Sequence, residues 1–330
     1  MVSSAQVKAL VQSHSEQDDS QFYSIAMQVA AREARAGREK FAQELRDIVD
    51  RAKTAAPPKP ARTSVVRLVQ PRNGDVSSLL DVSYPEYRLR DIVFSPAVKI
   101  EVEELLVEQR QSGALAAHGL TPSKRVLLIG PPGTGKTTTA KAIAGELGLP
   151  LFIIRFDTLI TRYMGETAAK LRLVFDELAE TKGVYLFDEV DALGGDRGLS
   201  NDVGEVRRIL NSFLQFLETD PSDSLILAAT NHPQLLDPAM FRRFDKVIHF
   251  PLPDAAAIED VIKNRLATFS LSRLSWQKVI NAAKGLSHAD ICVAAENAAK
   301  RVVLAGEKTL PTATLVAALE ARPRNRGGSD

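Results

Sequence analysis

The stretch RVLLIGPPGTGKT, residues 125–137, decides how this chain folds. Residues 125–129 have the apolar composition of a buried β-strand, and they run directly into a glycine-rich loop that matches the pattern G-x-x-x-x-G-K-[S/T]. The sequence predicts a helix that opens at Thr138. A strand, a phosphate-binding loop and a helix in this order predict an α/β sheet that binds a nucleotide at its edge.

Each part of the phosphate-binding loop (residues 130–137) has a chemical role. Gly133 and Gly135 permit backbone angles that turn successive N–H groups toward phosphate oxygens. Lys136 can reach the β- and γ-phosphates of ATP, and the Thr137 hydroxyl can ligate Mg²⁺. The alternative, a glycine-rich turn with a solvated lysine, fits poorly with a strand before the loop and a helix after it. The nucleotide-binding residues predicted here are Gly130, Pro131, Pro132, Gly133, Thr134, Gly135, Lys136, Thr137 and Thr138.

A second apolar strand, residues 184–187, ends in the adjacent carboxylates Asp188 and Glu189. The carboxyl end of a parallel strand is where such sheets bind ligands. Asp188 is therefore predicted to hold the Mg²⁺ shell, and Glu189 to orient and polarise the attacking water. A solvated acidic strand end is the alternative, and its pairing with the preceding loop argues against it.

The rest of the chain separates into segments that differ in composition and in hydrophobic periodicity. Helix-period segments alternate with the short apolar runs 125–129, 151–156, 184–187, 225–229 and 246–250, which predicts a parallel sheet with helices on both faces. Beyond Pro251 the strands stop and three helices are predicted, at 255–269, 276–284 and 289–306. The predicted organisation is a helical N-terminal unit (1–54), a proline-containing linker (55–75), a large nucleotide-binding domain (76–252), a small helical lid domain (253–322) and a disordered tail (323–330).

Composition excludes several classes of protein. The 330 residues carry 42 basic and 41 acidic side chains, so the net charge of +1 argues against a chain built to coat nucleic acid or an anionic membrane. The one cysteine, Cys292, rules out an intramolecular disulfide and is expected to be a buried thiol. No apolar run has membrane-spanning length and the start has no signal-peptide pattern, so a cytoplasmic protein is expected.

Three downstream segments narrow the class of nucleotide enzyme. They are LILAATN (225–231), LDPAMFRRFD (236–245) and GLSHADI (285–291). In this order and spacing the chain resembles the AAA ATPases from about Tyr87 to Leu319. Within that family it looks most like the protein-remodelling clade of katanin, spastin and the proteasomal ATPases.

The resemblance implies roles for matching residues. Asn231 looks like the sensor that helps to place the lytic water beside Glu189. Arg242 and Arg243 look like arginine fingers that reach the neighbouring subunit's site and stabilise the charge on the transferring phosphoryl group. If so, the site of a monomer is incomplete and oligomerisation is part of catalysis. The alternative for the arginine pair is a surface salt bridge with Asp245.

Two further positions are compared with the family's nucleotide contacts. Ile92 and Val93 fall in the segment beside adenine, although the family usually has glycine where this chain has Val93. Ala289 stands where many relatives carry a second sensor arginine, and the absence of that arginine resembles the remodelling clade. His288 either approaches the nucleotide or is a solvated residue at a helix cap.

After the strand at 151–156, the residues Tyr163, Met164 and Gly165 resemble the family's first pore loop. An aromatic ring and a flexible thioether can grip many polypeptides without reading their sequence, and Gly165 would let the loop move. The alternative is that Tyr163 and Met164 cap the core. The glycine-rich residues 194–201 are either a second pore loop or a plain surface loop.

These expectations combine into one working hypothesis and two rivals. The chain is expected to bind ATP and Mg²⁺ and to form a homo-oligomer, a hexameric ring, that threads a protein substrate. The N-terminal helices would recruit a substrate or partner, or associate with one another. One rival is an ATP-gated switch for a separate effector such as a peptidase. The other is a nucleic-acid remodeller, which the near-neutral charge and the aromatic pore motif disfavour.

Overall fold

The structure, a computed structural model, describes residues 43, 79–156, 165–193, 202–307 and 309–324. The chain divides into two compact units, Met1–Leu68 and Val69–Asp330, and almost all described residues belong to the second. The predicted N-terminal unit (1–54) and linker (55–75) lie outside the described residues, except for Gln43, which is helical. The predicted tail lies outside them from residue 325 onward.

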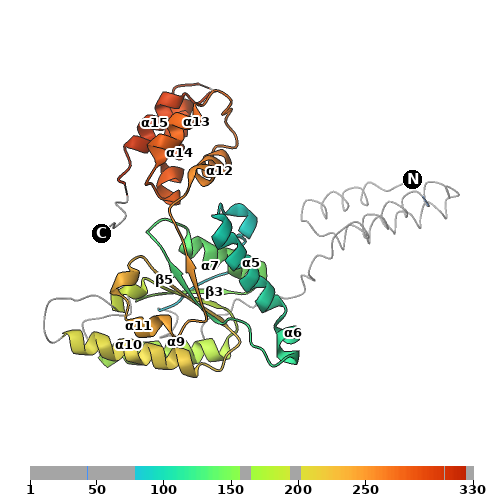
Figure 1. The fold of residues 1–330 in the computed structure, drawn as a ribbon, viewed down its shortest axis with the longest axis vertical. Helices are drawn as coiled ribbons and strands as arrows, with labels where there is room; N and C mark the ends of the chain where they lie inside the picture. The colour runs from blue at the N-terminus through green and yellow to red at the C-terminus, as the bar shows by residue number, and fades with distance from the viewer. Residues whose placement is uncertain (1–42, 44–78, 157–164, 194–201, 308, 325–330) are drawn as a thin grey trace, which may run out of the picture. The chain divides into compact units, whose positions relative to one another are not determined.

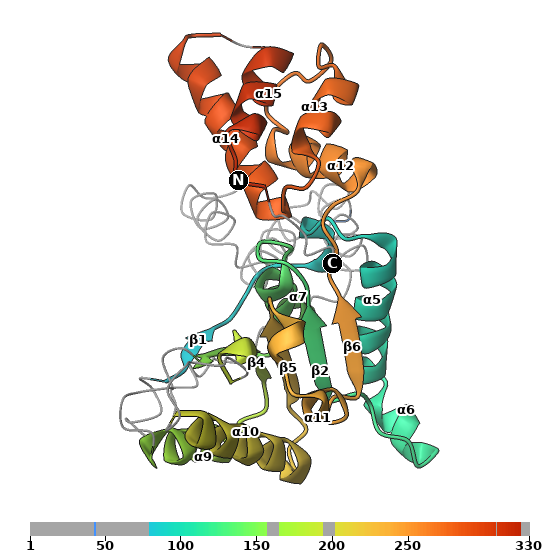
Figure 2. The ribbon, with the colours of Figure 1, turned by 60° about the vertical axis from the view of Figure 1, so that its left-hand side comes forward.

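The described part of the second unit contains a sheet in the order β1-β3-β4-β5-β2-β6 (Figures 1 and 2). Strands β2 to β6 are parallel, as the alternation of strands and helices predicts. The edge strand β1 is antiparallel to β3 and was not predicted. The strand bounds are β1 Asp81–Ser83, β2 Arg125–Ile129, β3 Leu151–Arg155, β4 Val184–Asp188, β5 Leu225–Thr230 and β6 Lys246–His249.

Helices cover both faces of this sheet. Alternate residues of each strand belong to different cores: Val126 and Leu128 pack with α5 (Pro96–Arg110) and α7 (Lys136–Leu147). Leu127 and Ile129 pack in the second core, with α9 (Gly165–Glu180) and α10 (Asp202–Thr219). Because both of their faces are buried, β2 to β5 are mainly apolar instead of alternating with polar residues.

The small domain consists of α12 (Ala255–Arg265), α13 (Trp276–Ala283), α14 (His288–Leu304) and α15 (Thr312–Glu320), which enclose a core of their own. The Asp254 side chain caps α12 by accepting from Ala257 N at 2.8 Å, and Ser287 Oγ caps α14 by accepting from Asp290 N at 3.2 Å. The three predicted helices are therefore present with ends shifted by a few residues. The fourth, α15, was not predicted.

Short elements join these parts. They are η1 (Leu89–Asp91), α6 (Ser112–Ala117), η2 (Val190–Leu193), η3 (Pro233–Leu235) and α11 (Pro238–Phe241). None of the described helices combines the length and apolar character needed to cross a bilayer.

The registers align the carboxyl ends of neighbouring strands. Ile129 at the end of β2 lies opposite Thr230 at the end of β5, and Phe187 of β4 lies opposite Ala228 of β5. The loops that follow β2, β4 and β5 therefore meet at one edge of the sheet, where ligands bind in open parallel sheets.

Candidate nucleotide site

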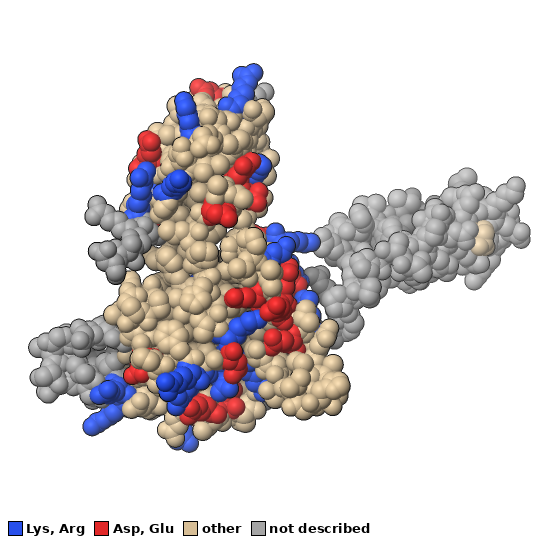
Figure 3. All heavy atoms as spheres, viewed as in Figure 1, with Lys and Arg blue, Asp and Glu red and all other residues tan. Residues whose placement is uncertain are grey.

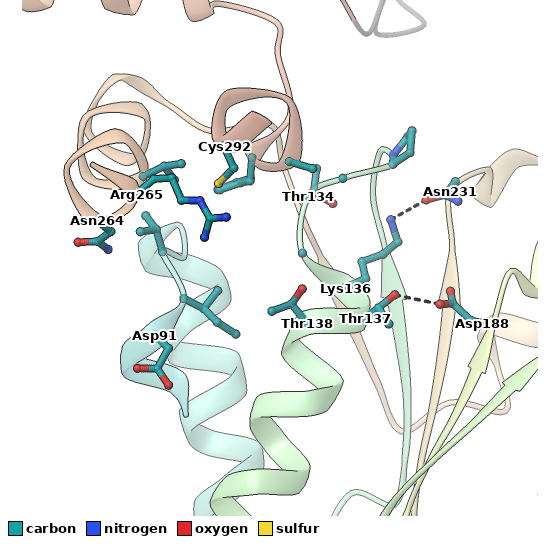
Figure 4. Close-up of a pocket in the computed structure, with 18 of the residues that line it drawn as sticks. Asp91, Thr134, Lys136, Thr137, Thr138, Asp188, Asn231, Asn264, Arg265 and Cys292 are labelled. Atoms are coloured by element: carbon teal, nitrogen blue, oxygen red, sulfur yellow. Dashed lines mark hydrogen bonds between the residues drawn. The ribbon is translucent and has the colours of Figure 1, made fainter. Parts of the chain in front are cut away.

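A pocket of about 510 Å³ opens at this edge. It is lined by the phosphate-binding loop, the end of β4, the residue after β5, the segment 91–93 and the facing sides of α12 and α14 (Figure 4). The predicted site residues that line it are Ile92, Val93, Pro132, Gly133, Thr134, Gly135, Lys136, Thr137, Thr138, Asp188, Glu189, Asn231 and Ala289. Residues far apart in the sequence thus meet in one cavity.

The loop geometry explains why glycine stands at position 133. Gly133 has φ of +75°, and a Cβ there would lie 2.5 Å from Ser287 Oγ. The next glycine, Gly135, has φ of 103° and precedes the first residue of α7. The structure begins this helix at Lys136 instead of the predicted Thr138. The amino end of α7 with its unpaired N–H groups is therefore directed at the pocket.

Lys136 is buried, with 6% of its surface exposed, and its ammonium is held by three acceptors. Nζ donates to Gly130 O at 2.6 Å and to Pro131 O at 3.0 Å. It also donates to Asn231 Oδ1 at 2.7 Å (Figure 4). Burial lowers the Lys136 pKa to about 8, although the Asp188 and Asp191 carboxylates oppose that fall. The phosphate end of the pocket therefore has a positive charge that is weakly solvated, which strengthens its attraction for a phosphate.

Thr137 and Asp188, the two residues predicted to hold Mg²⁺, lie side by side. Thr137 Oγ1 donates to Asp188 Oδ2 at 2.9 Å (Figure 4). A hydroxyl and a carboxylate are hard oxygen donors, and Mg²⁺ is usually held by one or two carboxylates together with substrate phosphates. This pair therefore fits Mg²⁺, which would neutralise phosphate charge when bound.

Glu189 has an unusual backbone conformation. Its φ of 58° is the only left-handed value among the described residues other than glycine. Such a conformation costs about 1–3 kcal/mol and is found mostly at functional sites, where the surroundings enforce it. Here the buried β4 precedes Glu189 and the buried Val190 follows it. The turn between them brings Glu189 to the pocket wall.

The small domain closes the other side of the pocket. Ala289 N donates to Gly133 O at 3.0 Å, so the start of α14 contacts the phosphate-binding loop directly. His288 also lines the pocket. Both of its ring nitrogens are buried and make no hydrogen bond to described residues, which excludes a solvated cap. The cap is Ser287, and burial lowers the His288 pKa although the nearby Asp254 charge opposes that effect.

Four pocket residues of the small domain were not predicted as site residues: Val261, Asn264, Arg265 and Cys292. Figure 4 shows the Arg265 guanidinium directed into the pocket from α12. Arg265 also forms an ion pair with Glu296. Burial raises the pKa of the Cys292 thiol, so this cysteine is mostly protonated. It is only partly buried and lines the pocket, whereas a buried thiol was predicted.

The two predicted arginine fingers differ in their surroundings, and neither lines the pocket of its own chain. Arg242, at the end of α11, is exposed. Arg243 is partly buried, and its Nε lies 2.5 Å from Glu218 Oε1. Asp245 pairs instead with Arg125, at 2.9 Å, so the predicted alternative of a bridge to Asp245 is not observed among the described contacts.

The predicted pore residues Tyr163 and Met164 lie outside the described residues, and so does the loop 194–201. Gly165 is described and is the first residue of α9.

Comparison with known proteins agrees with this geometry. The family model for "ATPase family associated with various cellular activities (AAA)" matches residues 126–252. A Sinorhizobium fredii protein described as "Uncharacterized AAA family ATPase y4kL" is 32% identical over 326 residues, which is 98% of this chain and 96% of that protein.

Two longer proteins match part of the chain. Protein SAV of Sulfolobus acidocaldarius is 37% identical over 64% of this chain, and the match covers 28% of that protein. The ATP-dependent zinc metalloprotease FtsH of Helicobacter felis is 32% identical over 66% of this chain, and the match covers 36% of FtsH. The chain therefore spans about a third of the length of these two relatives.

Proposed function

Because the chain belongs to the AAA family of ATPases, we propose that it assembles into a hexameric ring in which ATP hydrolysis remodels or threads a protein substrate. Each active site would lie between two subunits. One subunit supplies the pocket described above, and the next supplies Arg242 and Arg243.

Within a subunit, the contacts among the pocket residues support a separate role for each of them. Lys136 and the N–H groups at the start of α7 bind the phosphates, with Mg²⁺ held by Thr137 and Asp188. Glu189 accepts a proton from the attacking water, and Asn231 helps to orient that water. These roles require that the attacking water lies near the Glu189 carboxylate and that the terminal phosphate is fixed in line with that water.

The observation that carries the proposal of a shared site is the placement of the arginine pair. The chain's own pocket contains the phosphate loop, the acidic pair and Asn231, but Arg242 and Arg243 lie outside its lining. The side chain of the exposed Arg242 makes no hydrogen bond or ion pair to the described residues and is therefore available to a neighbouring copy. An arginine at the transferring phosphoryl group typically accelerates hydrolysis by about 10³–10⁵-fold.

A polypeptide is the proposed substrate, and the charge distribution on one face of the described residues supports this choice over a nucleic acid. On the face shown in Figure 3, lysine and arginine side chains are interspersed with acidic ones over both the sheet domain and the small domain. Nucleic-acid-binding proteins instead concentrate basic side chains in a patch or stripe. In this proposal Tyr163 and Met164 grip the polypeptide, and the N-terminal helices recruit it.

A substrate trap tests the remodelling role. Glu189→Gln should bind ATP without hydrolysing it and should hold its substrate, so the variant is purified with ATP from its native cell and the co-eluting proteins are identified. The control is Glu189→Gln combined with Tyr163→Ala. A protein retained by the single variant and lost from the double variant supports threading. A partner retained equally by both contradicts threading and favours an ATP-gated switch.

A further inference from the structure

Asp191 takes no part in the roles assigned above, yet it contacts the segment that carries Asn231. We propose that Asp191 is a positioning residue that fixes the backbone on both sides of Asn231 and so aligns its amide with Lys136 and the terminal phosphate. The inference rests on the proposed role of Asn231 in hydrolysis.

The fold brings Asp191 to this place. Asp191 belongs to η2, between Val190 and Leu193, which are both buried in the core. Because β4 and β5 are parallel neighbours, the short helix that follows β4 lies beside the end of β5. There Asp191 Oδ1 accepts from Thr230 Oγ1 at 2.8 Å and from Asn231 N at 3.3 Å.

Thr230 extends the contact to the far side of Asn231. Its hydroxyl donates to Asp191 and accepts from His232 N at 3.0 Å. The residues before and after Asn231 are thus tied to one carboxylate, and Asn231 itself is tied through its backbone N–H. The Asn231 side chain in turn reaches Lys136, because its Oδ1 accepts from Lys136 Nζ at 2.7 Å.

A carboxylate suits this position because it accepts both hydrogen bonds at one oxygen. Bonds to a charged acceptor are also stronger than bonds between neutral groups. Asp191 therefore acts on the phosphate end of the pocket through Asn231, although it does not line the pocket itself.

A double-mutant cycle on the full-length oligomer tests this role, with kcat and KM for ATP measured in Asp191→Ala, Asn231→Ala and the double variant. Each single substitution should lower kcat by about 10- to 100-fold and change KM by less than about threefold, because the phosphate contacts remain. If Asp191 acts through Asn231, the double variant should be within about twofold of Asn231→Ala, since coupled residues are not additive.

Thr230→Val provides a second variant in case Asp191→Ala fails to fold. It keeps the shape of the side chain but removes the hydrogen bonds of the hydroxyl to Asp191 and from His232 N. The kcat should therefore fall in the wild-type background and stay unchanged in the Asn231→Ala background. Multiplicative losses in both cycles would overturn the positioning role and leave the proposed function intact. If instead Asn231→Ala hydrolyses ATP like the wild type, the proposed role of Asn231 fails and this inference fails with it.

Discussion

Raising the pH should weaken ATP binding through Lys136. The free protein holds this ammonium at a pKa of about 8 because burial outweighs the attraction of Asp188 and Asp191. ATP phosphates need the charged form. Below this pKa Lys136 is already charged, so the affinity for ATP should not change with pH. Above it, Lys136 must take up a proton when ATP binds, so the affinity should fall as the pH rises. Because the phosphates keep Lys136 charged in the complex across this range, the Kd should rise about eightfold between pH ~7.5 and ~9.

The assay is a titration with a fluorescent ATP analogue in the Glu189→Gln background, which prevents hydrolysis during the measurement. Calorimetry in buffers of different ionisation enthalpy should show that close to one proton is taken up per site at pH ~9. Lys136→Arg is the control, because a guanidinium stays charged throughout this range. Equal pH dependence in the two proteins, or a wild-type Kd that does not change, would refute the reasoning.

Three other predictions concern single contacts. Gly133→Ala should abolish ATP binding in the same titration, because the new Cβ would lie 2.5 Å from Ser287 Oγ, whereas Gly113→Ala, with no atom within 4 Å, should bind normally; equal binding by both contradicts the packing argument. Glu189→Gln should bind ATP normally but release phosphate about 10²–10⁴-fold more slowly, and undiminished turnover would remove Glu189 from the mechanism. Asp245→Ala should lower the free energy of unfolding by about 1–3 kcal/mol, since it loses bonds to Lys124 N at 3.0 Å and Arg125 N at 2.9 Å. Asp223→Ala, which removes an exposed ion pair to Lys124, should cost less than about 1 kcal/mol, and similar losses in chemical denaturation would contradict this.

The phosphate-binding loop and the parallel strands could be predicted from short stretches of sequence. The phosphate-binding loop has a fixed spacing, and the parallel strands β2 to β5 are largely buried on both faces, so composition and flanking turns identify them. The edge strand β1 was missed because it has three residues, Asp81–Ser83, and exists through its pairing with β3. Helix α15 was missed although its apolar residues include the buried Leu315 and Leu319, which pack into the small-domain core.

The site divides in the same way. Residues within motifs, such as Lys136 and Asp188, could be predicted because the spacing of each motif and the strand before it determine where its side chains lie. Asn264 and Arg265 reach the pocket only because α12 packs beside α14. No motif in the sequence predicts this packing of the two helices. Asp191 could have been proposed from the sequence, because it is a third acidic residue just after Asp188 and Glu189. Its partner Thr230 is identified only by the pairing of β4 with β5.

The most direct test of the central claim, an active site shared between subunits, is ATP hydrolysis by mixed oligomers. Lys136→Ala lacks a working pocket but keeps its arginines, whereas Arg242→Ala with Arg243→Ala keeps the pocket and lacks the arginines. Each should be inactive alone. Random mixing in equal amounts joins a working pocket to intact arginines at about a quarter of interfaces (one half times one half), so up to about a quarter of wild-type turnover should return. A mixture of Lys136→Ala with Glu189→Gln, which contains no complete site, is the control. If the first mixture is no more active than this control, the arginines do not act in trans and the shared site is contradicted.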